Sequence, residues 1–279
     1  MAFPPDEWST LHSNLMNCYD QIMENVVTHI NLRDGAIGDE GAIAISEALK
    51  ENSSVTMLDL FGNSIGLKGS IAIAKALKVN SSVCNINLGG NGIGDDGAIE
   101  IAKALKKNSS VCDINFGGNS IGNEGAIAIA EALKVNSSIS TISFGANFIE
   151  QEGAIAIAEA LMQNSSVTTI HLSGNSIRDE GAIAIAEALK VNSSLSVLYL
   201  GTNYIGDAGA IALADALKVN SSVSTINLHD SLIGNQGAIA FAEALNVNSS
   251  VSGIHLYANP IDNETKQHLK SIYDYRLCF

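Results

Sequence analysis

The sequence has little of the material from which an ordinary globular core is built. Aromatic residues make up 5% of its 279 residues, and it contains only 3 prolines. A chain of this length is expected either to divide into two domains or to form one elongated domain. Because large rings are scarce, the core must be assembled from many small and similar contacts. This composition favours a repeat protein.

Basic residues are also scarce, with 15 Lys and Arg against 29 Asp and Glu and a formal net charge of −14. Such a surface repels phosphate groups, so nucleic acids and anionic membranes are poor partners. No stretch approaches about 18 consecutive apolar residues, so no transmembrane helix is predicted. The first residues have neither a basic nor an apolar region, so we expect no signal peptide and a cytoplasmic location.

The sequence is rich in a repeat of 28 residues. Its marker is the tetrad Asn-Ser-Ser followed by Val, Ile or Leu, at Asn52, Asn80, Asn108, Asn136, Asn164, Asn192, Asn220 and Asn248. We predict nine units over residues 26–262, with strands starting near Val27, Val55, Val83, Val111, Ile139, Val167, Leu195, Val223 and Val251. A capping helix is expected within residues 1–25, and a second capping helix with a tail within residues 263–279, because an open solenoid must cover its ends. Asp262 is expected to cap the second helix, which carries Leu269 and Ile272. The first helix is expected to cover the first repeat with Trp8, Leu11, Leu15, Tyr19 and Ile22.

Each unit predicts a short strand followed by a helix. Val55, Leu58 and Leu60 are expected to point to one side of the chain, and Met57, Asp59 and Phe61 to the other. This alternation indicates a short strand with one buried face. In the second part of a unit, Ala42 and Ile45 begin an apolar stripe at helical spacing. Because one strand and one helix cannot close a core, the units must stack into a parallel sheet covered by a layer of helices.

Two helix columns keep the same residue in all eight predicted helices. One is isoleucine from Ile43 to Ile239, and the other is alanine from Ala48 to Ala244. We expect each isoleucine to fill the space over an alanine of the next helix. Acidic residues often precede the helix entries, and lysines often lie near the helix ends, which suits the helix dipole.

The pattern L-x-x-L-x-L-x-x-N-x-I-G-x-x-G-A-x-x-I-A-x-A-L resembles the repeats of ribonuclease inhibitor, Ran GTPase-activating protein and NOD-like receptors. The resemblance is to the ribonuclease-inhibitor-like class of leucine-rich repeats. It implies an α/β fold: a horseshoe-shaped solenoid with a parallel sheet on the concave face and helices on the convex face. It leaves the function open, because these relatives do different things.

The asparagine of that repeat class, whose amide is expected to bond to backbone in the turn, corresponds to Asn63, Asn91, Asn119, Asn147, Asn175, Asn203 and Asn259. Gly35 and Ser231 replace it, so the first and eighth turns are expected to be looser.

No motif in the sequence indicates catalysis, a cofactor or a metal site. Gly92–Gly97 matches G-x-G-x-x-G, but two aspartates lie where a pyrophosphate would bind. The Asn-Ser-Ser tetrads, and Asn263, are N-glycosylation sequons, but the tetrads suit a turn between helix and strand. The few cysteines lack C-x-x-C spacing, and Cys84 and Cys112 are predicted to be free thiols about one strand spacing apart, ~4.8 Å. We therefore expect a protein that is not an enzyme.

Candidate binding residues are the outward strand positions, which change from repeat to repeat. Large side chains at these positions gather toward the start (Arg33, Met57, Asp59, Phe61) and toward the end (His171, Tyr199, His229, His255, Tyr257) of the predicted concave face. In the outward column that contains Arg33 and Phe61, the middle positions are mostly glycines, which predicts a shallow trough. A second candidate surface is the loop rim, at Phe148, Tyr204 and Leu232. Aromatic and arginine side chains often anchor interfaces, although neutral drift on a solvated face also explains such variation.

Three functions remain open. The first is a protein-interaction module, with a recognition or scaffold role and a protein partner of unknown identity. The second is a GTPase activator or another regulator acting in trans, for which Arg33 is the candidate arginine. The third is a structural protein that assembles with copies of itself into a homo-oligomer.

Overall fold

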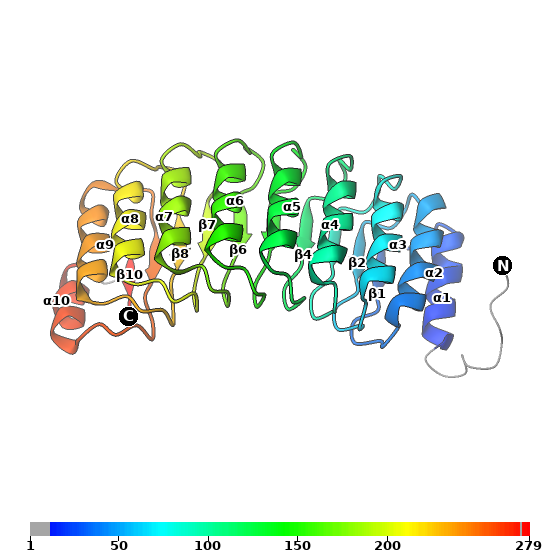
Figure 1. The fold of residues 1–279 in the computed structure, drawn as a ribbon, viewed down its shortest axis with the longest axis horizontal. Coiled ribbons are helices and arrows are strands. Elements are labelled where there is room, and N and C mark those ends of the chain that lie inside the picture. Colours follow the sequence, from blue (N-terminus) through cyan, green and yellow to red (C-terminus); the bar gives the residue numbers. More distant parts are fainter. Residues whose placement is uncertain (1–11, 274) are drawn as a thin grey trace.

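The computed structural model describes residues 12–273 and 275–279. Within these residues, ten helices alternate with ten strands (Figure 1). The strands are β1 (His29–Asn31), β2 (Met57–Asp59), β3 (Asn85–Asn87), β4 (Asp113–Asn115), β5 (Thr141–Ser143), β6 (Thr169–His171), β7 (Val197–Tyr199), β8 (Thr225–Asn227), β9 (Gly253–His255) and β10 (Leu277–Cys278). The helices are α1 (His12–Met23), α2 (Gly38–Glu51), α3 (Leu67–Leu77), α4 (Gly94–Leu105), α5 (Asn123–Leu133), α6 (Gln151–Leu161), α7 (Arg178–Leu189), α8 (Asp207–Leu217), α9 (Asn235–Val247) and α10 (Asn263–Tyr273).

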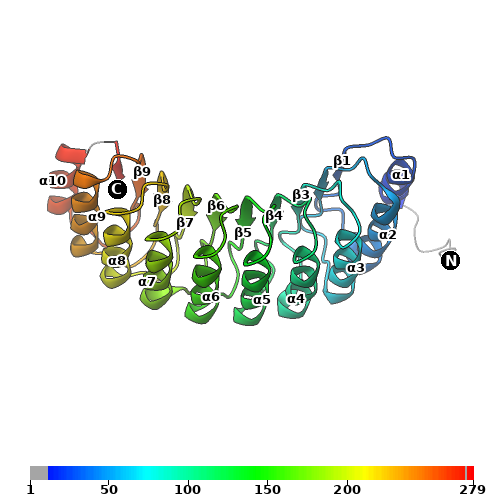
Figure 2. The ribbon, with the colours of Figure 1, turned by 90° about the horizontal axis from the view of Figure 1, so that it is seen from above.

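All ten strands form one open parallel sheet in chain order. From β1 to β9 each residue pairs with the residue 28 positions later, as His29 does with Met57. The strands lie along the inner side of an arc and the helices along its outer side (Figure 2). This is the α/β horseshoe that the repeat pattern predicted.

The core lies between the sheet and the helices. Val55, Leu58 and Leu60 are at most 1% exposed, as the alternation predicted. Ala42 and Ile45 of the helical stripe are equally buried. Burial of the same columns in successive units holds the solenoid together, since each unit covers the apolar face of its neighbours.

The isoleucine column is less buried than expected. Five of its members, Ile127, Ile155, Ile183, Ile211 and Ile239, are 37 to 43% exposed. The alanine column is buried. The isoleucines therefore lie only partly between helices, and they form an apolar row on the convex face.

The Asn-Ser-Ser tetrads form a buried ladder between units. Nδ2 of Asn108 donates to the carbonyl oxygens of Leu77 (2.8 Å) and Asn80 (3.1 Å), both in the preceding unit. Its Oδ1 accepts from the backbone of Ser110 and Val111. All eight tetrad asparagines are 5 to 7% exposed. Because the nitrogen that would carry a glycan is buried and bonded, these sequons have a structural role.

The asparagines of the strand-to-helix turn form a second ladder. Nδ2 of Asn119 donates to the carbonyl oxygen of Leu88 in the preceding unit (2.8 Å) and to that of Phe116 in its own unit (3.0 Å). Ser231 interrupts this ladder: it is 7% exposed, and its hydroxyl has no partner among the described residues. The eighth turn therefore lacks bonds that its neighbours have, as the departure from the pattern suggested.

Acidic residues at the helix entries act on the next unit as well as on their own helix. Oδ1 of Asp95 accepts from the backbone N–H groups of Gly122 and Gly125, both at 2.8 Å, at the start of α5. Asp39, Asp179 and Asp207 each accept the same pair of bonds from backbone N–H groups of the following unit. The G-x-G-x-x-G match thus contains a cap for a helix N-terminus rather than space for a phosphate.

The two ends differ in part from expectation. At the start, Ile22 is fully buried and Tyr19 packs against the core, whereas Trp8, Leu11 and the side chain of Leu15 lie outside the described residues. At the other end Asp262 caps α10, accepting from the backbone of Thr265 at 2.7 Å, as predicted.

The C-terminal helix buries less than expected, and the tail contains a strand. Leu269 of α10 is 4% exposed, but Ile272, which was expected to pack beside it, is 56% exposed. The tail adds β10 to the sheet, where Leu277 pairs with Ile254 and is fully buried. Tyr275 is 80% exposed, while Phe279 packs against the core.

Candidate interaction surface

The strand register sets the variable residues side by side on the concave face. Met57, Asn85 and Asp113 are consecutive partners in one column, and Asp59, Asn87 and Asn115 are consecutive partners in the next. The same holds for His171 and Tyr199 farther along. The predicted columns are therefore real neighbours, about 4.8 Å apart along the sheet.

The N-terminal cluster of Arg33, Met57, Asp59 and Phe61 is partly engaged with itself. The guanidinium of Arg33 lies over the Phe61 ring, 4.1 Å from the centroid. It is also 4.0 Å from Asp59 and 3.6 Å from Asp34. Met57 is 40% exposed. Because Arg33 is stacked and close to two carboxylates, it is held in place on this face.

A hollow of about 310 Å³, which sequence reasoning missed, adjoins this cluster and shares Met57 and Asp59 with it. We call it the polar hollow after its asparagine and aspartate residues. Residues of β2, β3 and β4 line it: Met57, Leu58, Asp59, Asn85, Ile86, Asn87, Asp113 and Asn115. The asparagines and aspartates were visible in the sequence as column members, but they are small and polar. Only the curvature and register of the sheet bring them together around one space.

The C-terminal cluster comprises His171, Tyr199, His229, His255 and Tyr257. The rings of His171 and Tyr199 stack at 4.1 Å between centroids and are nearly parallel, at 8°. His255 and Tyr257 stack more loosely, at 5.9 Å and 23°. Nδ1 of His229 lies 2.7 Å from Oδ1 of Asn227. The structure thus gathers all five predicted residues on β6, β7 and β9 and on the turns that follow β8 and β9.

The predicted trough is shorter than the run of glycines suggests. A Cβ at Gly89 would meet the Phe61 ring at 2.9 Å, and one at Gly201 would overlap the imidazole of His229. The large rings at both sides therefore lie over the neighbouring glycines. Only around Gly117 and Gly145 are the nearest atoms backbone carbonyl oxygens and short polar side chains.

Burial changes two ionisable groups on this face. The pKa of His171 is lowered by burial, and the negative charge of Asp113 partly opposes this. The pKa of Asp113 is raised by burial, with His171 opposing. Both shifts favour the neutral form, so the desolvation of each group outweighs the attraction between them.

The rim residues are exposed. Phe148 is 68% exposed, and Tyr204 and Leu232 are each 58% exposed, so they do not pack down onto their own loops. Tyr204 and Leu232 line a second hollow of about 410 Å³ together with Arg178 and two acidic residues of α7. Large apolar side chains exposed in a row are typical of a contact surface.

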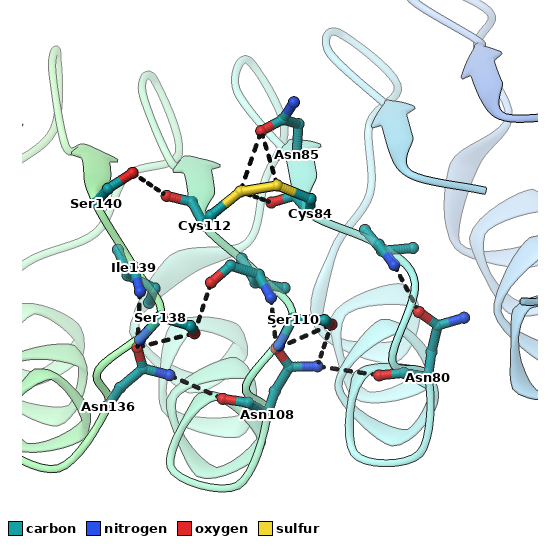
Figure 3. The surroundings of a disulfide bond; sticks show 12 residues. Asn80, Cys84, Asn85, Asn108, Ser110, Cys112, Asn136, Ser138, Ile139 and Ser140 are labelled. Atoms are coloured by element: carbon teal, nitrogen blue, oxygen red, sulfur yellow. Dashed lines mark hydrogen bonds between the residues drawn. A yellow bond between two sulfur atoms is a disulfide. The ribbon is translucent and has the colours of Figure 1, made fainter. Parts of the chain in front are cut away.

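The prediction of free thiols is wrong for one pair of cysteines. Cys84 and Cys112 form a disulfide that joins the third and fourth units (Figure 3). Their Cα atoms are 5.0 Å apart, close to the expected strand spacing and within the range for a disulfide. The error was to assign chemistry from the small number of cysteines, when the register alone placed the pair within bonding reach. Cys18 and Cys278 are free.

The described part of the chain contains no group of three or more His, Cys, Asp or Glu side chains arranged to hold a metal ion. Over the same residues, no helix has both the length and the apolar character needed to cross a membrane.

Comparison with known proteins identifies the repeat. The family model described as "Leucine Rich repeat" matches residues 25–46, 51–74, 80–102, 107–130, 163–186 and 191–214. These six segments together span about half of the chain. The chain belongs to the leucine-rich-repeat family. The same strand and helix also occur in stretches that the family model leaves out, such as β5 with α6 and β8 with α9.

Neither comparison with individual proteins adds to this. No curated protein matches the sequence. Among solved structures, one similar chain is "Leiomodin-1 Actin-Binding Site 2 (ABS2)", at 19% identity and a TM-score of 0.42. That match covers 66% of this leucine-rich-repeat chain and 90% of the other. At this identity and score, the similarity carries no information on function.

Proposed function

We propose that this leucine-rich-repeat chain is a non-catalytic protein-interaction module of the cytoplasm, with a recognition or scaffold role, whose partner lies in the concave face. The observation that carries the proposal is the C-terminal cluster. Its histidine and tyrosine rings are partly exposed, and four of the five stack in two pairs, His171 with Tyr199 and His255 with Tyr257. Rigid aromatic side chains bury a large area at little cost in entropy, so they are suited to anchor a protein partner.

The geometry of the leucine-rich repeats supports the same proposal. The sheet is open and curved, so its concave face offers a continuous surface from β1 to β10. At the opposite end of that surface, the N-terminal cluster would contribute the positive charge of Arg33 to the interface. The polar hollow lies next to it. The net charge of −14 favours a basic protein over nucleic acid or an anionic membrane.

The proposal is tested by affinity capture with a triple variant of the C-terminal cluster, Tyr199→Ala, His229→Ala and Tyr257→Ala. A matched control removes the rim, with Phe148→Ser, Tyr204→Ser and Leu232→Ser. We expect a partner that the wild type and the rim variant retain and the cluster variant loses. Loss in the rim variant alone would move the interface to the rim. Both variants must still unfold cooperatively.

A second candidate function is assembly of the chain with copies of itself. It is supported by the row of isoleucines on the convex face, each more than a third exposed from Ile127 to Ile239. Contiguous apolar rows of this kind are unusual on a monomer. The mass in dilute solution tests it, because a strict monomer at all concentrations is incompatible with self-assembly.

A role as a GTPase activator is less well supported. Such an activator needs an arginine that reaches a bound nucleotide, and Arg33 is instead stacked on Phe61 close to Asp59. Unchanged GTP turnover by a partner GTPase with Arg33→Ala would exclude Arg33 from such a role.

A further inference from the structure

The disulfide lies in a column where the other residues carry hydroxyl groups. The equivalent position of the nine units reads Thr28, Thr56, Cys84, Cys112, Ser140, Thr168, Ser196, Ser224 and Ser252. Several of these hydroxyls donate to the backbone carbonyl of the preceding unit. Examples are Ser140 to Cys112 at 3.0 Å and Ser252 to Ser224 at 2.9 Å. The column is thus a ladder of small donors along one edge of the sheet.

The two cysteines fit this ladder as thiols as well as in a disulfide. Sγ of Cys112 lies 3.4 Å from the carbonyl oxygen of Cys84, the place that a hydroxyl takes in other units. Oδ1 of Asn85 lies 3.6 Å from Sγ of Cys84 and 3.7 Å from Sγ of Cys112, so it can accept from either S–H (Figure 3). When the S–S bond is reduced, the two side chains rotate apart, and the carbonyl of Cys84 and Oδ1 of Asn85 lie beside the pair as acceptors for its thiols.

The backbone around the pair does not depend on the bond between the sulfur atoms. The amide of Cys84 donates to Thr56 at 2.9 Å, and that of Cys112 donates to Cys84 at 2.8 Å. Both cysteines are half-buried rather than enclosed in the core. We therefore expect a small thiol or disulfide to reach them without opening of the solenoid.

We propose that Cys84 and Cys112 form a reversible dithiol–disulfide site that exchanges with low-molecular-weight disulfides such as glutathione disulfide. The thiolate of one cysteine attacks glutathione disulfide, whose S–S bond breaks, giving a mixed disulfide and one glutathione. The second cysteine then attacks the protein sulfur of the mixed disulfide and releases the second glutathione. Two cysteine thiols are oxidised, one glutathione disulfide is reduced, and both thiol protons end on glutathione.

The position of the site links the exchange to the concave face. Asn85 and Asp113 directly follow the two cysteines, and both line the polar hollow. The disulfide ties β3 to β4 across 28 residues of chain, so it restrains local opening between the third and fourth units. The redox state of the pair therefore sets how firmly the floor of the hollow is held.

The test equilibrates the folded chain with glutathione and glutathione disulfide at a series of ratios. Free thiols are then trapped with N-ethylmaleimide, and the cysteine peptides are weighed. We expect Cys84 and Cys112 to lose their labels together as the disulfide fraction rises and to regain them when it falls. Cys18 and Cys278 are free, so they can form only mixed disulfides with glutathione, and the peptide masses distinguish these from the disulfide between Cys84 and Cys112.

A matched variant, Cys112→Ser, restores the hydroxyl found in other units and removes the second thiol. In this variant Cys84 should accumulate a mixed disulfide with glutathione, which the wild type resolves. Full labelling of both cysteines of the wild type at every ratio would overturn the proposal. So would a disulfide that glutathione reduces only after the chain is unfolded, since that would be a permanent cross-link.

Discussion

The guanidinium of Arg276 completes the buried asparagine ladder where the tetrads end, by donating to the carbonyl oxygen of Asn248. It donates to Asn248 at 2.9 Å and to Leu245 at 2.8 Å. The same two places, one unit earlier, are taken by Nδ2 of Asn248, which donates to Leu217 and Asn220. The arginine thus donates to the eighth unit as the next tetrad asparagine donates to each earlier unit.

Replacing Arg276 should therefore loosen the C-terminal end of the solenoid. We expect Arg276→Met to lower the free energy of unfolding by about 2 kcal/mol, because two partly buried carbonyls lose charged donors. Arg276→Lys keeps the charge but cannot bond to both carbonyls in the same plane, so its loss should be intermediate. Urea unfolding measures both variants. Equal stability of wild type and Arg276→Met would show that water replaces the guanidinium.

The gap at Ser231 predicts a stabilising substitution. In other units the backbone amide at the position of Ile205 donates to Oδ1 of the next ladder asparagine, as Ile177 does to Asn203. Here residue 231 is serine, its hydroxyl is buried without a partner, and the amide of Ile205 has no acceptor among the described residues. Ser231→Asn should restore these bonds and add about 1–2 kcal/mol to the free energy of unfolding.

A control substitution distinguishes stabilisation by the restored hydrogen bonds from a general stabilising effect of asparagine in a turn. Ser176 lies in another turn but outside the ladder, so Ser176→Asn should leave the unfolding midpoint nearly unchanged. If Ser231→Asn lowers the midpoint instead, the eighth turn has a backbone that cannot accept the longer side chain.

The sequence was sufficient for the parts of the fold that the 28-residue period controls. The burial of Leu58 and the pairing of His29 with Met57 follow from the repeat, because each unit places equivalent residues at equivalent points. The role of Arg276 was missed because of its residue type. It lies 28 positions after Asn248, where the period places the next tetrad asparagine, but it is an arginine.

The candidate surface was predicted less well than the fold. Which columns face outward follows from strand alternation, but how their side chains lie does not. The rotamers that lay Phe61 over Gly89 and His229 over Gly201 depend on contacts between units. Asp113, in the polar hollow, was read only as one member of a column. Side-chain conformation and curvature decide these features, and neither has a signature in the repeat.

The disulfide predicts a measurable difference in stability. Closing a loop of 28 residues restricts the unfolded chain, and in the chain-entropy description this adds about 3–4 kcal/mol. In the double variant Cys84→Ser with Cys112→Ser, the free energy of unfolding should be lower than in the oxidised wild type by this amount. Denaturant unfolding of both proteins measures the difference. The double variant should match the wild type after reduction, because serine keeps the hydroxyl ladder. A double variant as stable as the oxidised protein would mean that strain in the native bond cancels the entropic gain.

We expect the free energy of unfolding to depend on pH near neutrality through the imidazole of His171. Burial lowers its pKa below the ordinary value of 6.5, so the folded chain binds this proton less readily than the unfolded chain. The contribution of His171 to the free energy of unfolding is therefore complete above pH 6.5 and is lost as the pH falls from there through the folded pKa. Because the ring is only partly buried, the loss should stay below about 1 kcal/mol.

Asp113 provides the second arm of this test, since its charge raises the pKa of His171. An NMR titration of the His171 ring should give a pKa below 6.5 in the wild type and a still lower one in Asp113→Asn. If Asp113→Asn raises the pKa or leaves it unchanged, the carboxylate does not act on the ring across the sheet. If the wild-type pKa is at or above 6.5, the stack on Tyr199 does not desolvate the imidazole, and the loss of stability on acidification should vanish with it.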